Sequence, residues 1–228
     1  MPSNATVALP CAMADMPVRS AAEILAGVSR ETRAKLEIYE AELRRWQRVK
    51  NLVGPSTLNE VWTRHFADSL QLSPLADGNI WADLGSGAGF PGLVVAIARP
   101  GTQVHLVESD GRKCAFLRHV TRATGATAKV WEGRIDAVLP NLQPIPNVVT
   151  ARALASLDEL LDLAAPLLMN GATGLFPKGR EHLAELTKAA ESWRFDMDAI
   201  PSAVDLDGRI LRIRHFGGRI TSRPTDPT

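Results

Sequence analysis

The sequence predicts an α/β fold in which a mainly parallel sheet is covered by helices on both faces. From Ile80 onward, short apolar runs alternate with helical stretches and short turns. A glycine-rich turn follows the first apolar run and opens a helix. The composition agrees, because 45% of the 228 residues are hydrophobic and 22% are charged, close to globular usage. These observations favour a doubly wound core and exclude fibrous, repeat and largely disordered chains.

A helical segment is predicted ahead of the sheet. Between residues 18 and 50, apolar side chains recur at spacings of three and four residues, namely Leu36, Tyr39, Leu43 and Trp46. We expect the apolar side chains of this face to pack on the core rather than to stack on nucleic-acid bases. Residues 51–55 interrupt the pattern, and residues 57–72 predict a further helix.

The predicted elements of the core follow in order. Apolar runs predict strands at 80–84, 104–107, 128–131, 148–151 and 174–176. Helical spacing predicts helices that begin at Pro91 and that span 111–124, 156–169 and 180–193. A closing pair of strands is expected at 195–200 and 210–216. In the second of these, Arg212 and Arg214 alternate with apolar residues, which predicts a basic, solvated face.

The change of pattern divides the chain into four expected regions. These are a loose lead-in at 1–17, a helical N-terminal extension at 18–76, a core domain at 77–221 and a loose tail at 222–228.

Several classes of protein are disfavoured by simple features. No stretch approaches the roughly 20 apolar residues that span a bilayer, and the N-terminus lacks the pattern of an export signal. We therefore expect a cytoplasmic protein with no membrane partner. Cys11 and Cys114 provide neither a disulfide framework nor zinc-ligand spacing, and no metal site is expected. Cys114 is expected to be a buried thiol. No apolar seam beyond the core is evident, so a monomer is expected.

Basic residues are clustered although the formal net charge is only +1. They gather in residues 30–50, 112–134 and 209–223. Such clusters are consistent either with solvated helix and strand faces or with a nucleic-acid partner, and both interpretations stay open at this point.

The glycine turn indicates a nucleotide-like ligand. Gly85, Gly87 and Gly89 alternate after a strand, but Phe90 stands where a dinucleotide fingerprint has its third glycine. S-adenosylmethionine, which has no phosphate, is therefore the better candidate, with NAD as the alternative. Asp83 would place negative charge near the cationic ligand, and Glu108 would accept hydrogen bonds from ribose hydroxyls. The competing interpretations are a tight turn without a ligand and a surface acid at a strand end.

A series of motifs resembles one enzyme family in order from Leu36 to Gly179. The motifs are His65-Phe-Ala-Asp-Ser-Leu70, Asp83-Leu-Gly-Ser-Gly-Ala-Gly-Phe-Pro-Gly92, Lys113-Cys-Ala-Phe-Leu117, Gly133-Arg134, Thr150-Ala-Arg-Ala-Leu154 and Pro177-Lys-Gly179. This run resembles the bacterial small-subunit ribosomal RNA guanine-N7 methyltransferases, once called glucose-inhibited division protein B. Gly-Phe-Pro-Gly and Ala-Arg-Ala are more specific than the glycine turn, which all class I methyltransferases share.

The resemblance implies a Rossmann-like class I methyltransferase with a mainly parallel, seven-stranded sheet, helices on both faces and an N-terminal helical extension. It implies that S-adenosylmethionine is used to methylate a guanine in the decoding-region loop of 16S ribosomal RNA, free or within the small subunit. The family's cofactor contacts fall on Gly85, Phe90, Ile135, Asp136 and Arg152. Asp83 and Arg134 match further active-site positions, and Lys178 matches the Lys-Gly element. Glu108 stands where relatives often carry Asp.

Guanine N7 has an in-plane lone pair and no hydrogen, so its methylation needs no general base. Catalysis can then rest on positioning and electrostatics. In agreement, the segment from Asn147 to Arg152 contains neither the Asn/Asp-Pro-Pro-aromatic pattern of amine methylation nor a Pro-Cys nucleophile.

Three cations are the expected catalytic group. Arg152 should face the cleft and hold the cofactor carboxylate or the guanine. Arg134 and Lys178 are assigned either contact with RNA or a solvated position. His65 and Asp68, three residues apart, are either part of the site or a local hydrogen bond. A dinucleotide oxidoreductase and a non-catalytic RNA-binding module remain the alternative functions.

Overall fold

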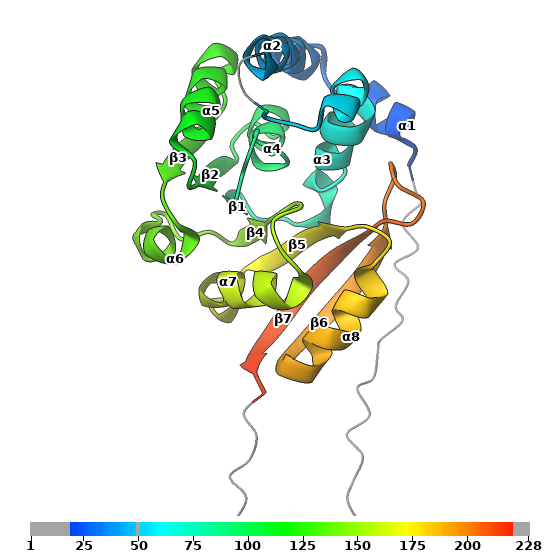
Figure 1. The fold of residues 1–228 in the computed structure, drawn as a ribbon, viewed down its shortest axis with the longest axis vertical. Coiled ribbons are helices and arrows are strands. Elements are labelled where there is room, and N and C mark those ends of the chain that lie inside the picture. Colours follow the sequence, from blue (N-terminus) through cyan, green and yellow to red (C-terminus); the bar gives the residue numbers. More distant parts are fainter. Residues whose placement is uncertain (1–18, 49–50, 221–228) are drawn as a thin grey trace, which may run out of the picture.

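A computed structural model describes residues 19–48 and 51–220 (Figure 1). Seven strands form one sheet in the order β3-β2-β1-β4-β5-β7-β6. The strands are β1 (Ile80–Leu84), β2 (Gln103–Glu108), β3 (Ala128–Glu132), β4 (Val148–Thr150), β5 (Thr173–Lys178), β6 (Trp193–Pro201) and β7 (Arg209–Arg219). Strands β1 to β5 pair in parallel, and β7 is antiparallel to both β5 and β6. The predicted fold class is therefore confirmed.

Helices cover both faces of the sheet. The core helices are α4 (Gly92–Ala98), α5 (Gly111–Thr124), α6 (Ile135–Val138), α7 (Leu157–Met169) and α8 (His182–Ser192), with a 3-10 turn at Leu139–Asn141. Figure 1 shows α4 and α5 on one side of the strands and α7 and α8 on the other. Successive residues of β1 alternate between two buried clusters, because Trp81 packs with α4 and α5 and Ala82 packs with α7.

The segment before the sheet is helical, as predicted, but it is not one regular helix. Ser20 and Ser29 cap the separate helices α1 (Ala21–Ala26) and α2 (Arg30–Gln47), with Gly27 ending the first. The expected helix at 57–72 consists of a 3-10 turn (Pro55–Glu60), a π-helix (Val61–Ala67), the short α3 (Asp68–Leu70) and, after it, a 3-10 turn (Ser73–Leu75). Within the π-helix, the carbonyl of Arg64 accepts a hydrogen bond from Arg152, and π-type turns are frequent at functional sites.

Helix α2 packs on the core as the apolar spacing predicted. Tyr39 and Leu43 are fully buried, and Trp46 is partly buried against Phe116 of α5. The Tyr39 ring lies 5.4 Å from the ring of Phe90, nearly parallel to it, and its hydroxyl donates to the carbonyl of Ala88 in the glycine turn. The helical extension therefore contacts the turn directly.

The predicted basic, solvated face of β7 is confirmed at Arg214, which is exposed, and is wrong for the solvation of Arg212. Arg212 is half-buried, and it shares Asp198 of β6 with Arg214 through contacts of 2.7 and 2.9 Å. Asp198 is itself buried. The register of the β6–β7 hairpin places this acid opposite Arg212, and Arg214 reaches it from two residues further along β7, so one of the two positive charges is balanced.

The structure does not test the predictions for the ends of the chain or for its division into regions. The terminal regions 1–17 and 222–228, with Cys11, lie outside the described residues, and the domain boundary near residue 76 stays a prediction. Among the described residues, none of the helices combines the length and apolar character that crossing a bilayer requires.

Candidate active site

The glycine turn is built by backbone conformations that other residues rarely adopt. Gly85, Gly87 and Gly89 have φ angles of +64°, +57° and +97°. At Gly89 a side chain would also collide with its surroundings, since a Cβ atom would lie 2.5 Å from the Tyr39 hydroxyl. At Gly87 a Cβ atom would meet only the Gly85 carbonyl, at 3.8 Å, so this glycine leaves the turn open to a ligand.

A cavity of about 880 Å³ lies beside this turn at the carboxyl ends of the parallel strands. We call it the first cavity. Eight of the sequence-predicted site residues line it, namely Gly85, Gly87, Phe90, Glu108, Arg134, Ile135, Asp136 and Arg152. Asp83, Gly89 and Lys178 are not among its lining residues.

Glu108 connects the turn to the end of β2. Its Oε2 accepts the N–H of Gly87 at 2.8 Å, and its Oε1 accepts the N–H of Asp110 at 2.8 Å. Its side chain is therefore oriented by the backbone on both sides, while the residue still lines the first cavity. Since each carboxylate oxygen can accept a second hydrogen bond, Glu108 retains capacity to bind ligand hydroxyls.

Asp83 lies behind the turn rather than in the first cavity, which corrects the position expected for it. Its Oδ2 accepts the N–H of Gly92 at 3.1 Å, and its buried Oδ1 has no partner among the described residues. Burial raises the pKa of the Asp83 carboxyl from 3.8 to about 7, against the opposing effect of the hydrogen bond from Gly92.

The raised pKa of Asp83 predicts a specific dependence of stability on pH. Between pH 4 and 7 the folded state holds a proton that the unfolded chain has released, so the free energy of unfolding contributed by this group falls as pH rises. Each unit of pKa difference corresponds to about 1.4 kcal/mol. Asp83→Asn should lose this slope, measured by urea unfolding at pH 5 and pH 8. The exposed Asp77→Asn should keep it, and equal slopes in all three proteins would contradict the assignment.

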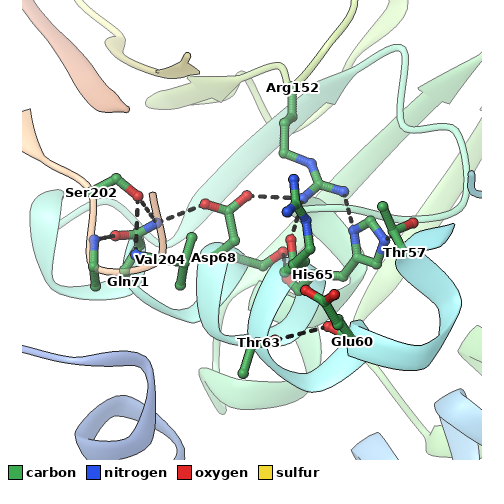
Figure 2. A network of polar contacts seen from close by, with 12 residues as sticks. Thr57, Glu60, Thr63, His65, Asp68, Gln71, Arg152, Ser202 and Val204 are labelled. Carbon is green, nitrogen blue, oxygen red and sulfur yellow. Dashed lines mark hydrogen bonds and ion pairs between the residues drawn. The ribbon is translucent and has the colours of Figure 1, made fainter. Parts of the chain in front are cut away.

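Arg152 is held by three groups of the helical extension (Figure 2). Its Nη1 donates to Asp68 Oδ2 at 2.8 Å and to the carbonyl of Arg64 at 3.1 Å, and its Nη2 lies 2.8 Å from His65 Nδ1. Its guanidinium also lies over the Phe90 ring, 5.2 Å from the centroid. The structure thus brings His65, Asp68 and Arg152 together in one cluster.

His65 is neutral in this arrangement. Burial, together with the charges of Arg152 and Arg64, lowers the pKa of His65 from 6.5 to about 4. Its Nδ1 accepts from Arg152, so its Nε2 carries the hydrogen and donates to Thr57 Oγ1, 3.0 Å away. Its ring stacks on Phe90 with centroids 4.7 Å apart.

A second cavity of about 850 Å³ adjoins the first. The two share Thr57, His65, Arg152 and Ala153, so the Arg152 cluster lies at their boundary. The second cavity is also lined by the β6–β7 loop (residues 202–208) and by several cations, namely Arg64, Lys178, Arg180 and Arg209.

Lys178 and Arg134 differ sharply in their surroundings. The Lys178 ammonium is 2.7 Å from Glu185 and donates to the carbonyl of Ala155 at 2.6 Å, and its side chain is only 8% exposed. The alternative of a solvated Lys178 is therefore wrong, while its contact with RNA stays a prediction. Arg134 is 83% exposed at the start of α6 and is 3.3 Å from Asp136.

Some residues of the site were not anticipated from the sequence. Leu154 covers Gly85, where a Cβ atom would lie 2.6 Å from Leu154 Cδ1. Ala153 has a φ of +52°, a strained value for a residue with a side chain. Both follow Arg152 in the Ala-Arg-Ala-Leu element, whose specificity was the available signal. Ser109 and Lys113 also line the first cavity, and their position just after β2 could have indicated this.

The three basic clusters differ in how their cations are paired. Cations of the first are paired along α2, for example Lys35 with Glu31 at 2.7 Å and Arg44 with Glu40 at 2.8 Å. In the last, β7 arginines are paired with acids, as described above. In the middle cluster, Arg118 is paired with Glu132 at 3.0 Å. Arg64 and Arg209, which line the second cavity, have no acid within ion-pair distance in the described part of the chain.

Cys114 is buried, as predicted, and burial raises the pKa of its thiol to about 11. Within the described ranges, no group of three or more His, Cys, Asp or Glu residues is arranged to hold a metal ion.

Comparisons with known proteins agree on one family. The family model GidB, described as rRNA small subunit methyltransferase G, matches residues 32–208. A protein of Methylobacterium nodulans named ribosomal RNA small subunit methyltransferase G is 56% identical over 200 residues, which are 86% of this chain and 94% of the relative. One of the same name from Parvibaculum lavamentivorans is 51% identical over 199 residues, covering 85% and 88%.

Solved structures support the fold. An O-methyltransferase from Bacillus cereus in complex with SAH has a TM-score of 0.55 at 11% identity, covering 85% of this chain and 94% of that one. The O-methyltransferase TomG from Streptomyces achromogenes, in complex with SAM, has a TM-score of 0.54 at 12% identity, covering 88% and 99%. These likenesses confirm the Rossmann-like methyltransferase architecture. With the family match and the relatives at more than half identity, they establish that the chain belongs to the ribosomal RNA small subunit methyltransferase G (GidB) family.

Proposed function

We propose that this protein transfers the methyl group of S-adenosylmethionine to N7 of a guanine in the decoding-region loop of 16S ribosomal RNA. Membership of the family supports the reaction class and the RNA. The observation that carries the proposal is the position of Arg152, which lies at the boundary of two adjoining cavities, one beside the glycine turn and one lined by cations.

The residues of the first cavity fit the cofactor. Gly87 leaves space at the turn, and Glu108 offers acceptors suited to ribose hydroxyls. Ile135 and Asp136 would border the adenine, and the unpartnered Asp83 Oδ1 places a carboxylate behind the turn. When bound, S-adenosylmethionine supplies a methyl group on a positively charged sulfur. The Glu108 carboxylate at the turn is electrostatically suited to that charge, and Asp83 adds negative charge as its buried carboxyl ionises near pH 7.

The residues at the boundary are suited to orient the acceptor. Three of the five N–H donors of Arg152 are used by Asp68, His65 and the Arg64 carbonyl, which leaves two for a ligand. Its planar fork can hold a carboxylate or a guanine edge. Since guanine N7 has no proton to lose, the chain only has to position the base and exclude water.

The second cavity is the proposed entrance of the RNA. Arg64 is exposed on its wall. Arg180, which follows β5, and Arg209, at the start of β7, line the same cavity. Arg180 is weakly paired with Asp207 at 3.4 Å, and both are exposed. Such cations suit the phosphates that flank a base placed in the cavity.

Binding and transfer assays test this proposal. We expect calorimetry to show binding of S-adenosylhomocysteine and not of NAD, and we expect 16S RNA treated with the protein and cofactor to gain N7-methylguanine, detected by borohydride and aniline cleavage. Binding of NAD alone would favour an oxidoreductase. Binding of RNA without either nucleotide would favour a non-catalytic RNA-binding module.

The partner and its setting follow from the same proposal. We infer that the partner is 16S RNA, free or within the small ribosomal subunit, that the protein acts as a monomer, and that it acts in the cytoplasm. Sedimentation with and without RNA tests the oligomeric state, and a dimer in the absence of RNA would contradict it.

Salt dependence should identify the cations that bind RNA. Each phosphate-binding cation that a substitution removes should reduce the slope of log affinity against log salt by about one. The double variant Arg64→Gln/Arg209→Gln should therefore bind RNA more weakly and with a shallower slope in filter-binding titrations. Arg44→Gln, which removes an arginine already paired with Glu40, is the control and should change neither. Equal behaviour of both variants would exclude the second cavity as the RNA entrance.

A further inference from the structure

A continuous hydrogen-bonded path joins Arg152 to the β6–β7 loop (Figure 2). Asp68 accepts from Arg152 through Oδ2 and from Gln71 Nε2 through Oδ1, both at 2.8 Å. Gln71 in turn accepts the N–H of Ala203 at 2.8 Å, and its Nε2 is 3.3 Å from Ser202 Oγ. Both oxygens of the Asp68 carboxylate therefore make hydrogen bonds, as do the oxygen and the nitrogen of the Gln71 amide. Asp68 in α3 and Gln71 directly after it connect the arginine to the loop.

The loop at the far end of this path is part of the second cavity. It contributes Asp205, Leu206 and Gly208 to the wall. Leu206 is 96% exposed, so RNA that enters the cavity would be able to contact it. A contact with the loop is therefore connected through Gln71 and Asp68 to the guanidinium at the boundary of the two cavities.

We propose that Asp68 and Gln71 are positioning residues, which fix the orientation of Arg152 and couple it to the β6–β7 loop of the RNA cavity. The inference rests on the proposed function and gives the helical extension its role. Asp68 is mostly buried beside Arg152, with side-chain exposures of 14% and 19%, so their ion pair is shielded from solvent. A shielded, hydrogen-bonded pair fixes geometry more strongly than an exposed pair does.

His65 holds the guanidinium from another side. It provides an acceptor at Nδ1 and an aromatic ring that stacks on Phe90. These two roles can be separated by substitution. Asparagine keeps an acceptor near the position of Nδ1 and loses the ring, whereas phenylalanine keeps the ring and loses the acceptor.

An exchange of donor and acceptor tests the path directly. Asp68→Asn places an amide against the Gln71 amide, and Gln71→Glu places a second carboxylate against Asp68, so each single variant breaks one link. In the double variant, the amide at position 68 can donate to the carboxylate at position 71, which can still accept from Ala203. The hydrogen bond between positions 68 and 71 is then restored with donor and acceptor exchanged, while Arg152 and Ala203 still donate to the two ends of the path.

The measured quantities are kcat and KM for 16S RNA, the Kd of S-adenosylhomocysteine and the melting temperature. We expect each single variant to lower kcat at least about tenfold, because the broken link between positions 68 and 71 leaves the side chain at position 68, and with it Arg152, without a fixed orientation. The Kd of S-adenosylhomocysteine should change little, and the melting temperature should fall but stay above the assay temperature, so that the loss of kcat is measured on folded protein. The double variant should recover most of the missing kcat. Single variants with normal kcat, or a double variant as impaired as the product of the two singles, would overturn the inference.

The His65 pair gives a second readout that packing alone would not produce. If His65 positions Arg152, His65→Asn retains more turnover than His65→Phe, although it removes the stacked ring. If His65 only packs on Phe90, the order is reversed, and this would count against the positioning cluster.

The wild-type protein distinguishes failure of the positioning role from failure of the proposed function. Wild type that binds cofactor and methylates N7, together with fully active single variants, would overturn the positioning role alone. Wild type that transfers no methyl group to RNA would overturn the proposed function and this inference with it.

Discussion

Arg152→Ala should lower kcat/KM for methyl transfer by about a hundredfold or more, the scale seen when one preorganised donor is removed from an active site. The expectation follows from the two free N–H donors of Arg152 at the boundary of both cavities. Turnover with radiolabelled cofactor and calorimetry with S-adenosylhomocysteine measure the effect. Normal turnover would remove Arg152 from the site.

The structure predicts a larger loss of stability for Arg152→Ala than the sequence does. A solvated arginine at a strand end would cost little to remove, but Arg152 is paired with a mostly buried Asp68. Its removal leaves an unpaired carboxylate and should reduce the free energy of unfolding by about 1–3 kcal/mol. Arg152→Lys is the matched control, because it keeps the charge beside Asp68 and loses the fork. It should remain nearly as stable as wild type and still be impaired in turnover.

Gly89→Ala should lower the free energy of unfolding considerably more than Gly101→Ala does. A Cβ atom at Gly89 would lie 2.5 Å from the Tyr39 hydroxyl and 3.0 Å from both Leu93 Cβ and Leu117, all in the core. Overpacking of this kind and the positive φ together should cost about 3 kcal/mol, measured as the shift of the urea midpoint.

Gly101→Ala provides the comparison for this variant. Gly101 also has a positive φ, +85°, but a Cβ atom there meets nothing within 4 Å. Its destabilisation should be limited to backbone strain, about 1 kcal/mol. Equal destabilisation at the two positions would show that the contact with Tyr39 contributes nothing.

Most of the fold could be predicted from local patterns in the sequence. The alternation of strands and helices, the glycine turn and the helix caps depend on residues close in sequence, so they could be predicted. The pairing of Arg212 with Asp198, and that of Lys178 with Glu185, depends on strand register and on how a helix returns to the sheet. Neither is encoded within a single segment, so Arg212 was predicted to be more solvated than it is, and the surroundings of Lys178 stayed open.

The candidate site was predictable to a similar extent. Residues at the carboxyl ends of parallel strands converge by topology, which is why Glu108, Phe90 and Arg152 were placed together. Asp83 was misplaced because the position of a residue at a strand end does not reveal which side of the turn its carboxylate occupies. His65 and Asp68 could not be assigned, because their partner is more than 80 residues away in the chain.

Tyr39 is the single tyrosine of the sequence, and burial raises the pKa of its phenol well above 10. An alkaline spectrophotometric titration therefore has one chromophore of this type to follow. Phenolate absorbance should emerge only as α2 detaches from the loop it touches, which gives an optical signal for that one event without any introduced label.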